Sequence, residues 1–326
     1  MKVHLVGEAA THAADLRAHL DDGIEVSELP ASVAHDGAHD GELGSDDVLV
    51  SLRLRRGRGP LPQVGLLHVP GAGLDGVDLD QLPTATAVCN VYEHEGPIAE
   101  FVLANLLEWE IGAGQLRQRM HTMPWPDLYR QRVPHGEVAG RRLLLIGYGR
   151  IGQAIARRAA AFGIAAHALD DYARPDAAAT LHPTGDLLDQ LPRADYVVLA
   201  CPLTNSTRGL IDSTALAAMA QHALLVNPSR AEIVEEQALY AALEQQRIGG
   251  AVLDVWYRYP GADGDPDGPA TLPFLDLPNA WCTPHSSAWT RELSRRRYAV
   301  IADNVNRFTD GRPLRNVVRD PRPARG

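Results

Sequence analysis

Residues 143–163 read Leu-Leu-Leu-Ile-Gly-Tyr-Gly-Arg-Ile-Gly-Gln-Ala-Ile-Ala-Arg-Arg-Ala-Ala-Ala-Phe-Gly. The apolar run Leu143–Ile146 predicts a buried strand, and Ile151–Phe162 predicts a helix. Between them, Gly147, Gly149 and Gly152 form a G-x-G-x-x-G motif. Because the motif follows a strand and opens a helix, it indicates a dinucleotide-binding βαβ unit in a parallel sheet.

Each glycine of this motif has its own physical task. Gly147 permits the tight turn, Gly149 lets the backbone approach a pyrophosphate, and Gly152 lets the helix pack closely on the strand. The free N–H groups and the dipole at the helix N-terminus favour the anionic pyrophosphate. The alternative is that the glycines serve packing alone.

A second predicted strand, Ala165–Leu169, ends at Asp170, which lies 18 residues after Gly152. A ribose-binding acid is expected at a spacing of about 20 residues. A carboxylate there accepts hydrogen bonds from ribose hydroxyls and repels a 2′-phosphate, and Asp171 adds to that repulsion. We therefore expect NAD rather than NADP as the cofactor.

Strands and helices alternate along most of the rest of the chain. The other expected strands are Val3–Val6, Asp47–Ser51, Leu66–Val69, Ala87–Asn90, Asp195–Ala200, Ala223–Asn227 and Gly249–Asp254. The other expected helices are Thr11–Leu20, one from Pro97 to about Met120, and Glu235–Gln246. This alternation predicts an α/β protein with two doubly wound parallel-sheet domains of the Rossmann or flavodoxin type. We expect a loop over Tyr257–Pro278 and partial disorder from Asp310 to the C-terminus.

Composition excludes several classes of function. The 326 residues carry 31 Lys+Arg and 41 Asp+Glu, a net charge of −10, which gives no footprint for nucleic-acid binding. Lys2 is the single lysine, so chemistry based on a lysine Schiff base is not expected. The three cysteines are far apart, which argues against a disulfide framework or a zinc site, and we expect no metal. No apolar run approaches the length of a membrane span and no secretory signal opens the chain, so we expect a cytoplasmic protein with no membrane partner.

Three polar residues stand at or just after the ends of predicted strands. Arg230 follows Val226-Asn227, Asp254 follows Leu253, and His285 follows Cys282-Thr283-Pro284. Ligands of open α/β sheets bind at the carboxyl ends of the strands. We therefore expect Arg230, Asp254 and His285 to converge beside the dinucleotide, although each alone could be a surface salt bridge or a structural histidine.

The chain resembles the D-isomer-specific 2-hydroxyacid dehydrogenase family over nearly its whole length. That family includes phosphoglycerate, glyoxylate, formate and phosphite dehydrogenases. The resemblance lies in Gly71-Ala72-Gly73-Leu74-Asp75, Ile98-Ala99-Glu100, the glycine motif, Cys201-Pro202-Leu203-Thr204-Asn205-Ser206-Thr207-Arg208-Gly209-Leu210-Ile211, Asn227-Pro228-Ser229-Arg230, Asp254-Val255 and Thr283-Pro284-His285. The order and number of these matches make the resemblance specific.

The resemblance implies roles for the matched residues. Arg230 would clamp the substrate carboxylate and polarise its carbonyl, using the planar fork of its guanidinium. The backbone of Ala72 and Gly73 would hold the same carboxylate from the other domain. His285 would be the acid/base that protonates the 2-oxo oxygen as hydride arrives. Asp254 would contact the nicotinamide end of the cofactor.

The resemblance also implies a domain organisation. Residues 1–95 and 291–326 would form a discontinuous substrate domain, with an NAD-binding Rossmann domain at 96–290 and a cleft between them. Family members are mostly dimers, and we expect a homodimer formed through the helix with Trp109 and through Met123-Pro124-Trp125-Pro126. The residues assigned to the cofactor are Gly147, Tyr148, Gly149, Arg150, Ile151, Gly152, Asp170, Pro202, Asp254 and Ser287.

Tyr259 departs from the family pattern. The family usually places Glu five residues after the position of Asp254, where it orients the histidine and raises its pKa; here that place holds Tyr259. A phenol can hydrogen-bond an imidazole but cannot stabilise imidazolium as a carboxylate does, so a lower pKa is expected for His285. The alternative is that Tyr259 faces solvent and Glu93 or Glu95 serves the histidine.

Two further residues are candidates for the substrate pocket. His94 falls where formate dehydrogenases carry a substrate-contacting Asn, and it could instead cap the helix that follows. Trp289 lies four residues after His285 and could wall the pocket or pack in the core.

The expected function is NAD-dependent interconversion of a D-2-hydroxy acid and its 2-oxo acid. Tyr259 motivates a first alternative, oxidation of a small anion such as formate or phosphite, because formate dehydrogenases also lack the Glu. A second alternative is an NAD-sensing or scaffold protein without turnover, against which the presence of both Arg230 and His285 argues.

Overall fold

The computed structural model describes residues 1–57, 59–260 and 267–321. The chain divides into two compact units: unit 1, Met1–Glu93 with Thr290–Gly326, and unit 2, His94–Trp289. The expected domain boundaries differ from these by one or two residues. Each unit has its own sheet and its own apolar core.

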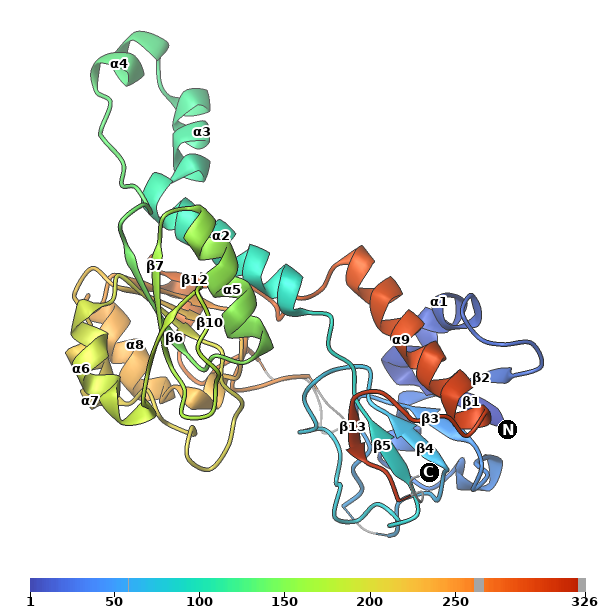
Figure 1. The fold of residues 1–326 in the computed structure, drawn as a ribbon. Coiled ribbons are helices and arrows are strands. Elements are labelled where there is room, and N and C mark those ends of the chain that lie inside the picture. The colour runs from blue at the N-terminus through green and yellow to red at the C-terminus, as the bar shows by residue number, and fades with distance from the viewer. Residues whose placement is uncertain (58, 261–266, 322–326) are drawn as a thin grey trace. The chain divides into compact units, whose positions relative to one another are not determined.

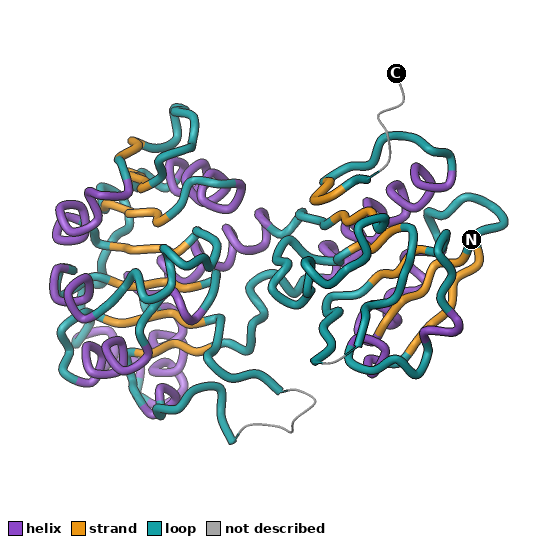
Figure 2. The backbone as a smooth tube through the Cα atoms, turned by 90° about the horizontal axis from the view of Figure 1, so that it is seen from below, coloured by secondary structure: helices purple, strands orange, loops and turns teal. Residues whose placement is uncertain are grey.

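Unit 2 is built on a seven-stranded parallel sheet, seen as one layer of strands in Figure 2. Its strands, in spatial order, are β12 (Ala280–Cys282), β11 (Gly250–Leu253), β10 (Leu224–Asn227), β9 (Tyr196–Leu199), β6 (Arg142–Ile146), β7 (Ala165–Leu169) and β8 (Thr180–His182). The chain leaves β6 toward β7 and β8, and then returns to β9 on the other side of β6. The strand order therefore reverses between β6 and β9, and dinucleotides bind doubly wound sheets at such a point.

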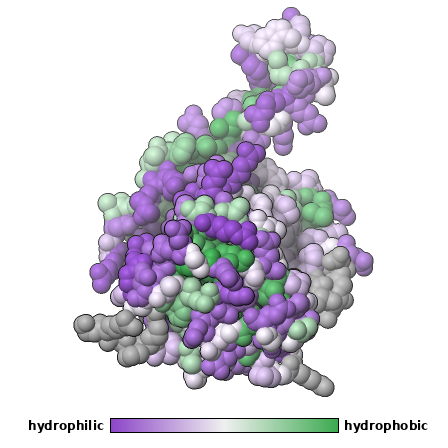
Figure 3. Space-filling model, turned by 90° about the vertical axis from the view of Figure 1, so that its right-hand side faces the viewer, coloured by the Kyte–Doolittle hydropathy of each residue, from purple (hydrophilic) through white to green (hydrophobic). Residues whose placement is uncertain are grey.

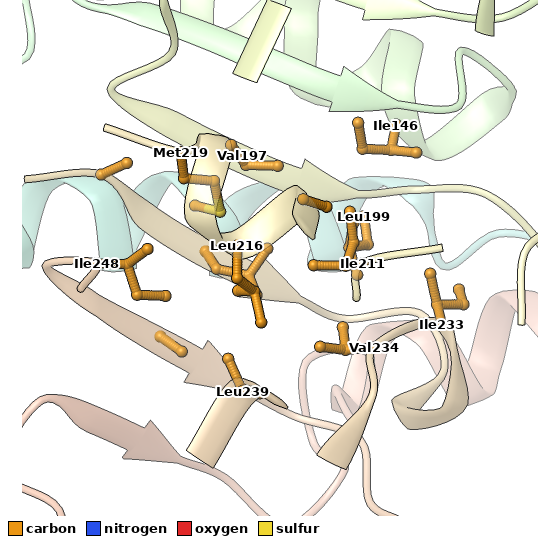
Figure 4. Packing of buried hydrophobic residues seen from close by; sticks show 14 of the residues in the cluster. Ile146, Val197, Leu199, Ile211, Leu216, Met219, Ile233, Val234, Leu239 and Ile248 are labelled. Carbon is orange, nitrogen blue, oxygen red and sulfur yellow. The ribbon is translucent and has the colours of Figure 1, made fainter. Parts of the chain in front are cut away.

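The sequence explains why β6 lies in the middle of this sheet. Leu143, Leu144, Leu145 and Ile146 are all buried, as a parallel strand covered on both faces requires. One apolar cluster covers each face of the sheet, and Figure 4 shows Ile146, Val197 and Leu199 of one cluster facing Leu216 and Ile211.

Helices cover the sheet of unit 2 on both faces. They are α2 (Glu95–Ile111), α5 (Arg150–Ala161), α6 (Leu187–Gln190), α7 (Ser213–Ala218) and α8 (Glu236–Glu244). Helix α5 packs against α2, and its buried residues are small apart from Ile155 (Figure 1). Small side chains let the helix that opens with the glycine motif lie close to its neighbours.

An arm projects from unit 2 where α2 ends. It consists of α3 (Ala113–Thr122) and α4 (Trp125–Arg130) and stands away from the sheet of this unit (Figure 1). Neither of these helices, both described in full, has a buried residue. The expected single helix from Pro97 to Met120 is wrong at one point, because Gly112 has a φ of 62° and separates α2 from α3. That left-handed conformation suits glycine and ends a helix.

Unit 1 has a six-stranded sheet whose spatial order is β13, β5, β4, β3, β1, β2. The strands are β1 (Lys2–Val6), β2 (Glu25–Leu29), β3 (Val48–Val50), β4 (Leu66–His68), β5 (Ala87–Cys89) and β13 (Val317–Arg319). Helices α1 (Ala13–Arg17) and α9 (Arg291–Thr309) pack on each other (Figure 1). All neighbouring strands are parallel except β13, which pairs antiparallel with β5.

Two expectations for unit 1 are wrong in detail. The helix expected over Thr11–Leu20 is a 3₁₀ helix over Gly7–His12 followed by the short α1. The tail expected to be partly disordered from Asp310 is ordered as far as it is described, to residue 321, and contains β13; residues 322–326 lie outside the described residues. The Arg319 side chain donates hydrogen bonds to the carbonyls of Leu79, Pro83 and Thr86. The backbone partner supplied by β5 orders this segment, although its own sequence lacks an apolar pattern.

The surface is mostly polar on the face shown in Figure 3, where hydrophobic residues occur in small separate groups. Within the described part of the chain, no helix combines the length and the apolar character that crossing a membrane requires.

Candidate active site

The glycine motif forms the turn between β6 and α5. Gly147 has a φ of 99°, and a Cβ there would lie 2.8 Å from the nitrogen of Cys201. A Cβ at Gly152 would lie 2.5 Å from the carbonyl oxygen of Gly147. Both positions therefore exclude a side chain, since real Cβ atoms do not make such close contacts.

Gly149 is different, because a Cβ there would meet no atom within 4 Å. Gly149 is the N-cap of α5, and no side chain caps this helix end. Open space beside uncapped N–H groups fits a pyrophosphate at the start of a 12-residue helix. The residues of this turn therefore fit a dinucleotide.

Asp170 ends β7 and is tied to the glycine motif. Its Oδ2 accepts a hydrogen bond from the Tyr148 N–H at 2.8 Å, and its Oδ1 accepts bonds from the N–H groups of Tyr172 and Ala173, both at 2.9 Å. Asp171 instead accepts hydrogen bonds from Thr184. The carboxylate of Asp170 is thus fixed beside the turn, where the ribose of a bound dinucleotide is expected.

Tyr148 was assigned to the cofactor, but its ring turns into the protein. The ring is buried, and its hydroxyl donates a 2.6 Å hydrogen bond to Oδ1 of Asp176. Burial raises the pKa of the Tyr148 phenol, and the Asp176 carboxylate raises it further. Its side chain therefore joins the glycine turn to the segment after β7.

The predicted residues at strand ends lie along one edge of the sheet. Strands β10, β11 and β12 are parallel neighbours, and they are followed by Arg230, Asp254 and His285. Because β6 runs parallel in the same sheet, the glycine turn lies at the same edge. The structure thus places Arg230, Asp254, His285 and the glycine turn at the carboxyl ends of the strands, as the sequence predicts.

Asp254 is fully buried and organises the loop that carries His285. Its Oδ1 accepts hydrogen bonds from the Thr283 hydroxyl at 2.6 Å and from the Ser286 N–H at 2.8 Å. Its Oδ2 accepts a bond from the Ser287 N–H at 2.9 Å. These bonds enclose His285, whose φ of 57° is in the left-handed region. The carboxylate therefore holds the loop in a backbone conformation that is uncommon for residues other than glycine.

Tyr259 contacts His285 directly. The Tyr259 oxygen lies 2.9 Å from Nδ1 of His285 and accepts a hydrogen bond from the Trp256 N–H at 3.1 Å. The Trp256 indole N–H donates in turn to the Thr283 carbonyl at 2.8 Å. The alternative in which Tyr259 faces away from the histidine is therefore wrong. Glu95, one of the two acids that this alternative offered as the partner of His285, lies 3.6 Å from Arg150 in an ion pair.

The surroundings lower the pKa of His285. The main cause is desolvation by neighbouring protein atoms, although His285 keeps an exposed surface. Asp254 acts in the opposite direction, and the positive charge of Arg230 adds to the lowering. Burial likewise raises the pKa of the Tyr259 phenol, while the Trp256 N–H and Arg230 oppose that rise. Both groups are thus held toward their neutral forms.

Arg230 is positioned by the residue that ends β10. The side-chain amide of Asn227 donates to the Arg230 carbonyl at 2.9 Å, and its oxygen accepts a bond from the Ser229 N–H at 3.1 Å. The Ser229 hydroxyl donates to the carbonyl of Cys201 at 2.5 Å. These bonds tie the Arg230 turn to the segment after β9, where Pro202 is exposed.

The remaining candidates occupy varied positions. Ser287 is buried with its N–H on Asp254, and Ile151 is half-buried at the start of α5. His94 is the N-cap residue of α2, the position that the capping alternative gives it, but its side chain makes no capping hydrogen bond. Trp289 is 63% exposed, so it does not pack in the core.

In unit 1, Ala72 and Gly73 lie in the loop after β4. The side-chain amide of buried Asn90 donates a hydrogen bond to the Ala72 carbonyl at 3.0 Å. This bond fixes the peptide that joins Ala72 to Gly73. The sequence patterns do not single out Asn90, Trp256 or Asp176. Their roles depend on contacts between distant segments, and no local pattern marks them.

Comparison with known proteins identifies the family. The family model described as "D-isomer specific 2-hydroxyacid dehydrogenase, NAD binding domain" matches residues 103–287. The chain belongs to the D-isomer specific 2-hydroxyacid dehydrogenase family. The matched residues include the glycine turn, Asp170, Arg230, Asp254 and His285.

Two curated relatives illustrate the family. The chain is 35% identical to (S)-sulfolactate dehydrogenase of Chromohalobacter salexigens over 73% of this chain and 75% of that protein. It is 30% identical to D-3-phosphoglycerate dehydrogenase of Methanocaldococcus jannaschii over 77% of this chain and 47% of that protein. The chain thus spans about half the length of that phosphoglycerate dehydrogenase.

A solved structure shares the fold. The NAD-complexed D-isomer specific 2-hydroxyacid dehydrogenase of Lactobacillus delbrueckii ssp. bulgaricus matches with a TM-score of 0.77 at 24% identity, over 98% of this chain and 100% of that chain. This likeness confirms the predicted fold class of two doubly wound α/β domains.

Proposed function

We propose that this protein transfers hydride between a nicotinamide dinucleotide and a small acid, interconverting a D-2-hydroxy acid and its 2-oxo acid. The observation that carries the proposal is the placement of Arg230, Asp254 and His285 after three neighbouring parallel strands, at the sheet edge that holds the glycine turn. Family membership supports the same reaction.

The residues proposed to hold the cofactor are those of unit 2. Gly147, Gly149 and Gly152 with the start of α5 would hold the pyrophosphate, and Asp170 would hold the ribose. The fixed Asp170 carboxylate and the neighbouring Asp171 favour NAD over NADP, because a 2′-phosphate would face negative charge. When bound, this cofactor supplies or accepts the hydride.

The residues proposed to act on the substrate are Arg230 and His285. The Arg230 guanidinium would hold the substrate carboxylate and draw charge from the adjacent carbonyl. His285 would exchange the proton of the substrate oxygen through Nε2, since Nδ1 faces Tyr259. The family resemblance further assigns substrate binding to the backbone at Ala72 and Gly73 and to His94 and Trp289.

Tyr259 supports one alternative reaction, oxidation of a small anion such as formate or phosphite. No carboxylate contacts His285 at the Tyr259 position, and formate oxidation needs no proton relay. A non-catalytic NAD-binding role is less well supported, because Arg230 and His285 are both present.

One assay separates these functions. NADH oxidation should be followed with a panel of 2-oxo acids, among them glyoxylate and hydroxypyruvate, and NAD reduction should be followed with formate and phosphite. Turnover of at least one 2-oxo acid is the expected result. Turnover of formate or phosphite alone would establish the alternative, and NADH binding without any turnover would establish the non-catalytic role.

We further propose that the arm joins two copies of the chain. It exposes Leu116, Met120, Trp125 and Tyr129, with exposed fractions of 43–61%. Trp109, on the helix expected at the interface, packs edge-on against Trp281 within unit 2. A homodimer buried through the arm would cover these apolar side chains. Sedimentation of the full chain and of Trp125→Asp tests this.

The cytoplasmic location stays a prediction.

A further inference from the structure

The hydrogen bonds around Tyr259 favour one direction for the bond to His285. The Tyr259 oxygen already accepts the Trp256 backbone N–H at 3.1 Å. A phenol has one hydrogen, and the His285 Nδ1 lies 2.9 Å away. The arrangement that satisfies all three groups within the protein has the phenol donating to Nδ1. Nδ1 is then an acceptor, and the ring proton of neutral His285 lies on Nε2.

Burial favours the neutral forms of both His285 and Tyr259, while the charges around the pair act in opposing directions. The charged groups that act on His285 are Arg230 and Asp254, and those on Tyr259 are Arg230, Asp254 and Glu232. Arg230 disfavours imidazolium and favours phenolate, while Asp254 acts in the opposite sense on both. A hydrogen bond donated to Nδ1 also stabilises the neutral ring. The glutamate that the family usually has at this position would instead stabilise the imidazolium form of His285.

We propose that Tyr259 is the proton source for reduction and that His285 passes the proton on without first becoming imidazolium. This inference rests on the proposed function and specifies its proton path. Tyr259 acts through His285, so it is a positioning and relay residue that does not touch the substrate.

The proposed step balances in atoms and charge. The reduced dinucleotide delivers hydride, with its two electrons, to the carbonyl carbon. The carbonyl oxygen takes the proton from Nε2 of His285, and Nδ1 takes the phenol proton of Tyr259. The phenolate keeps the Trp256 N–H bond. After the product leaves, water protonates Nε2 of the exposed His285 and Nδ1 returns its proton to the phenolate, which restores the starting tautomer. An alkoxide is a stronger base than a phenolate, so the transfer runs downhill.

The first test reads the tautomer without catalysis. Nitrogen NMR of the full chain labelled in histidine should show His285 neutral, with the proton on Nε2, at about pH 6.5, the ordinary histidine pKa. Tyr259→Phe removes the donor to Nδ1, so the pKa of His285 should rise by about half a unit to one unit. A proton on Nδ1 of neutral His285 in the wild type would overturn the relay.

The second test follows the hydride step in single-turnover NADH oxidation by the 2-oxo acid that the panel identifies. An enzyme that needs imidazolium with an ordinary pKa should keep about 1% of its acid-plateau rate at about pH 8.5. At the same pH the wild type should keep more than about half of its acid-plateau rate. Tyr259→Phe should lose about tenfold to a hundredfold at that pH and approach the wild type in acid.

The controls separate the relay from its alternatives. Tyr257→Phe changes a neighbouring tyrosine whose hydroxyl donates to the Val234 carbonyl, and it should keep the wild-type pH profile. Tyr259→Glu should restore dependence on imidazolium, with an alkaline limb about one unit above that of Tyr259→Phe. A wild-type rate that falls tenfold per pH unit, or an unchanged profile in Tyr259→Phe, would overturn the relay alone. If the protein binds NADH but turns over none of the 2-oxo acids, the proposed function is overturned as well.

Discussion

Replacing the buried carboxylate of Asp254 should damage stability and the hydride step together. Asp254→Ala leaves three donors without their acceptor: the Thr283 hydroxyl and the N–H groups of Ser286 and Ser287. An unsatisfied buried donor costs about 1–3 kcal/mol. Since some of these groups would find water, we expect a loss of about 3–5 kcal/mol in the free energy of unfolding.

The effect on catalysis follows from the loop geometry. His285 lies between the anchored residues with a φ of 57°, and releasing the anchors lets its backbone relax. A misplacement of about 1 Å costs about a hundredfold in rate, so the hydride step should slow by about that factor. Loss of the negative charge should also lower the pKa of His285 further, because Asp254 is the group that raises it.

The assay combines urea unfolding with single-turnover NADH oxidation. The matched control is Asp212→Ala, which removes a carboxylate that caps α7 by accepting the Ala215 N–H at 2.8 Å. That variant should lose about 1 kcal/mol and keep the wild-type hydride rate. If Asp254→Ala loses no more stability than the control, or keeps its hydride rate, Asp254 does not hold the His285 loop.

Three further predictions follow from other contacts. Titration should give tighter binding of NADH than of NADPH, and Asp170→Ala should narrow that preference; equal affinities in the wild type would contradict the assignment to NAD. His285→Ala should lower the reductive kcat by about 10²–10⁴-fold with NADH affinity intact, whereas Arg230→Ala should also raise KM, and near-normal turnover in both would exclude the family mechanism. Burial lowers the pKa of His68 to about 4 in the folded chain. As the pH falls below about 6.5, His68 is therefore protonated in the unfolded chain before it is protonated in the folded chain. Wild-type stability should therefore fall by up to about 3 kcal/mol between about pH 6.5 and 4 relative to His68→Gln, in urea titrations at several pH values; parallel curves would contradict this.

The sequence alone was sufficient for the parts of the site that depend on local structure. The run Leu143–Ile146 and the glycines after it identify a central strand and its turn, because burial on both faces and a φ of 99° at Gly147 leave few other residue types. Arg230, Asp254 and His285 were found in the same way, since parallel strands bring their carboxyl ends to one edge.

The irregular elements needed tertiary contacts. Residues 317–319 form β13 because β5 offers an open edge, and no alternation in the segment itself marks a strand. Helix α2 ends at Gly112, although the apolar pattern around it continues, because that glycine adopts a left-handed backbone.

The proton chemistry of the site was decided by tertiary structure. The sequence gives a tyrosine where the family has a glutamate, but a residue in a loop can point either way. The fold brings the Trp256 N–H to the Tyr259 oxygen and that oxygen to Nδ1 of His285, across 26 residues of chain. The proposed order of donors and acceptors rests on that contact, with the single phenol hydrogen serving Nδ1.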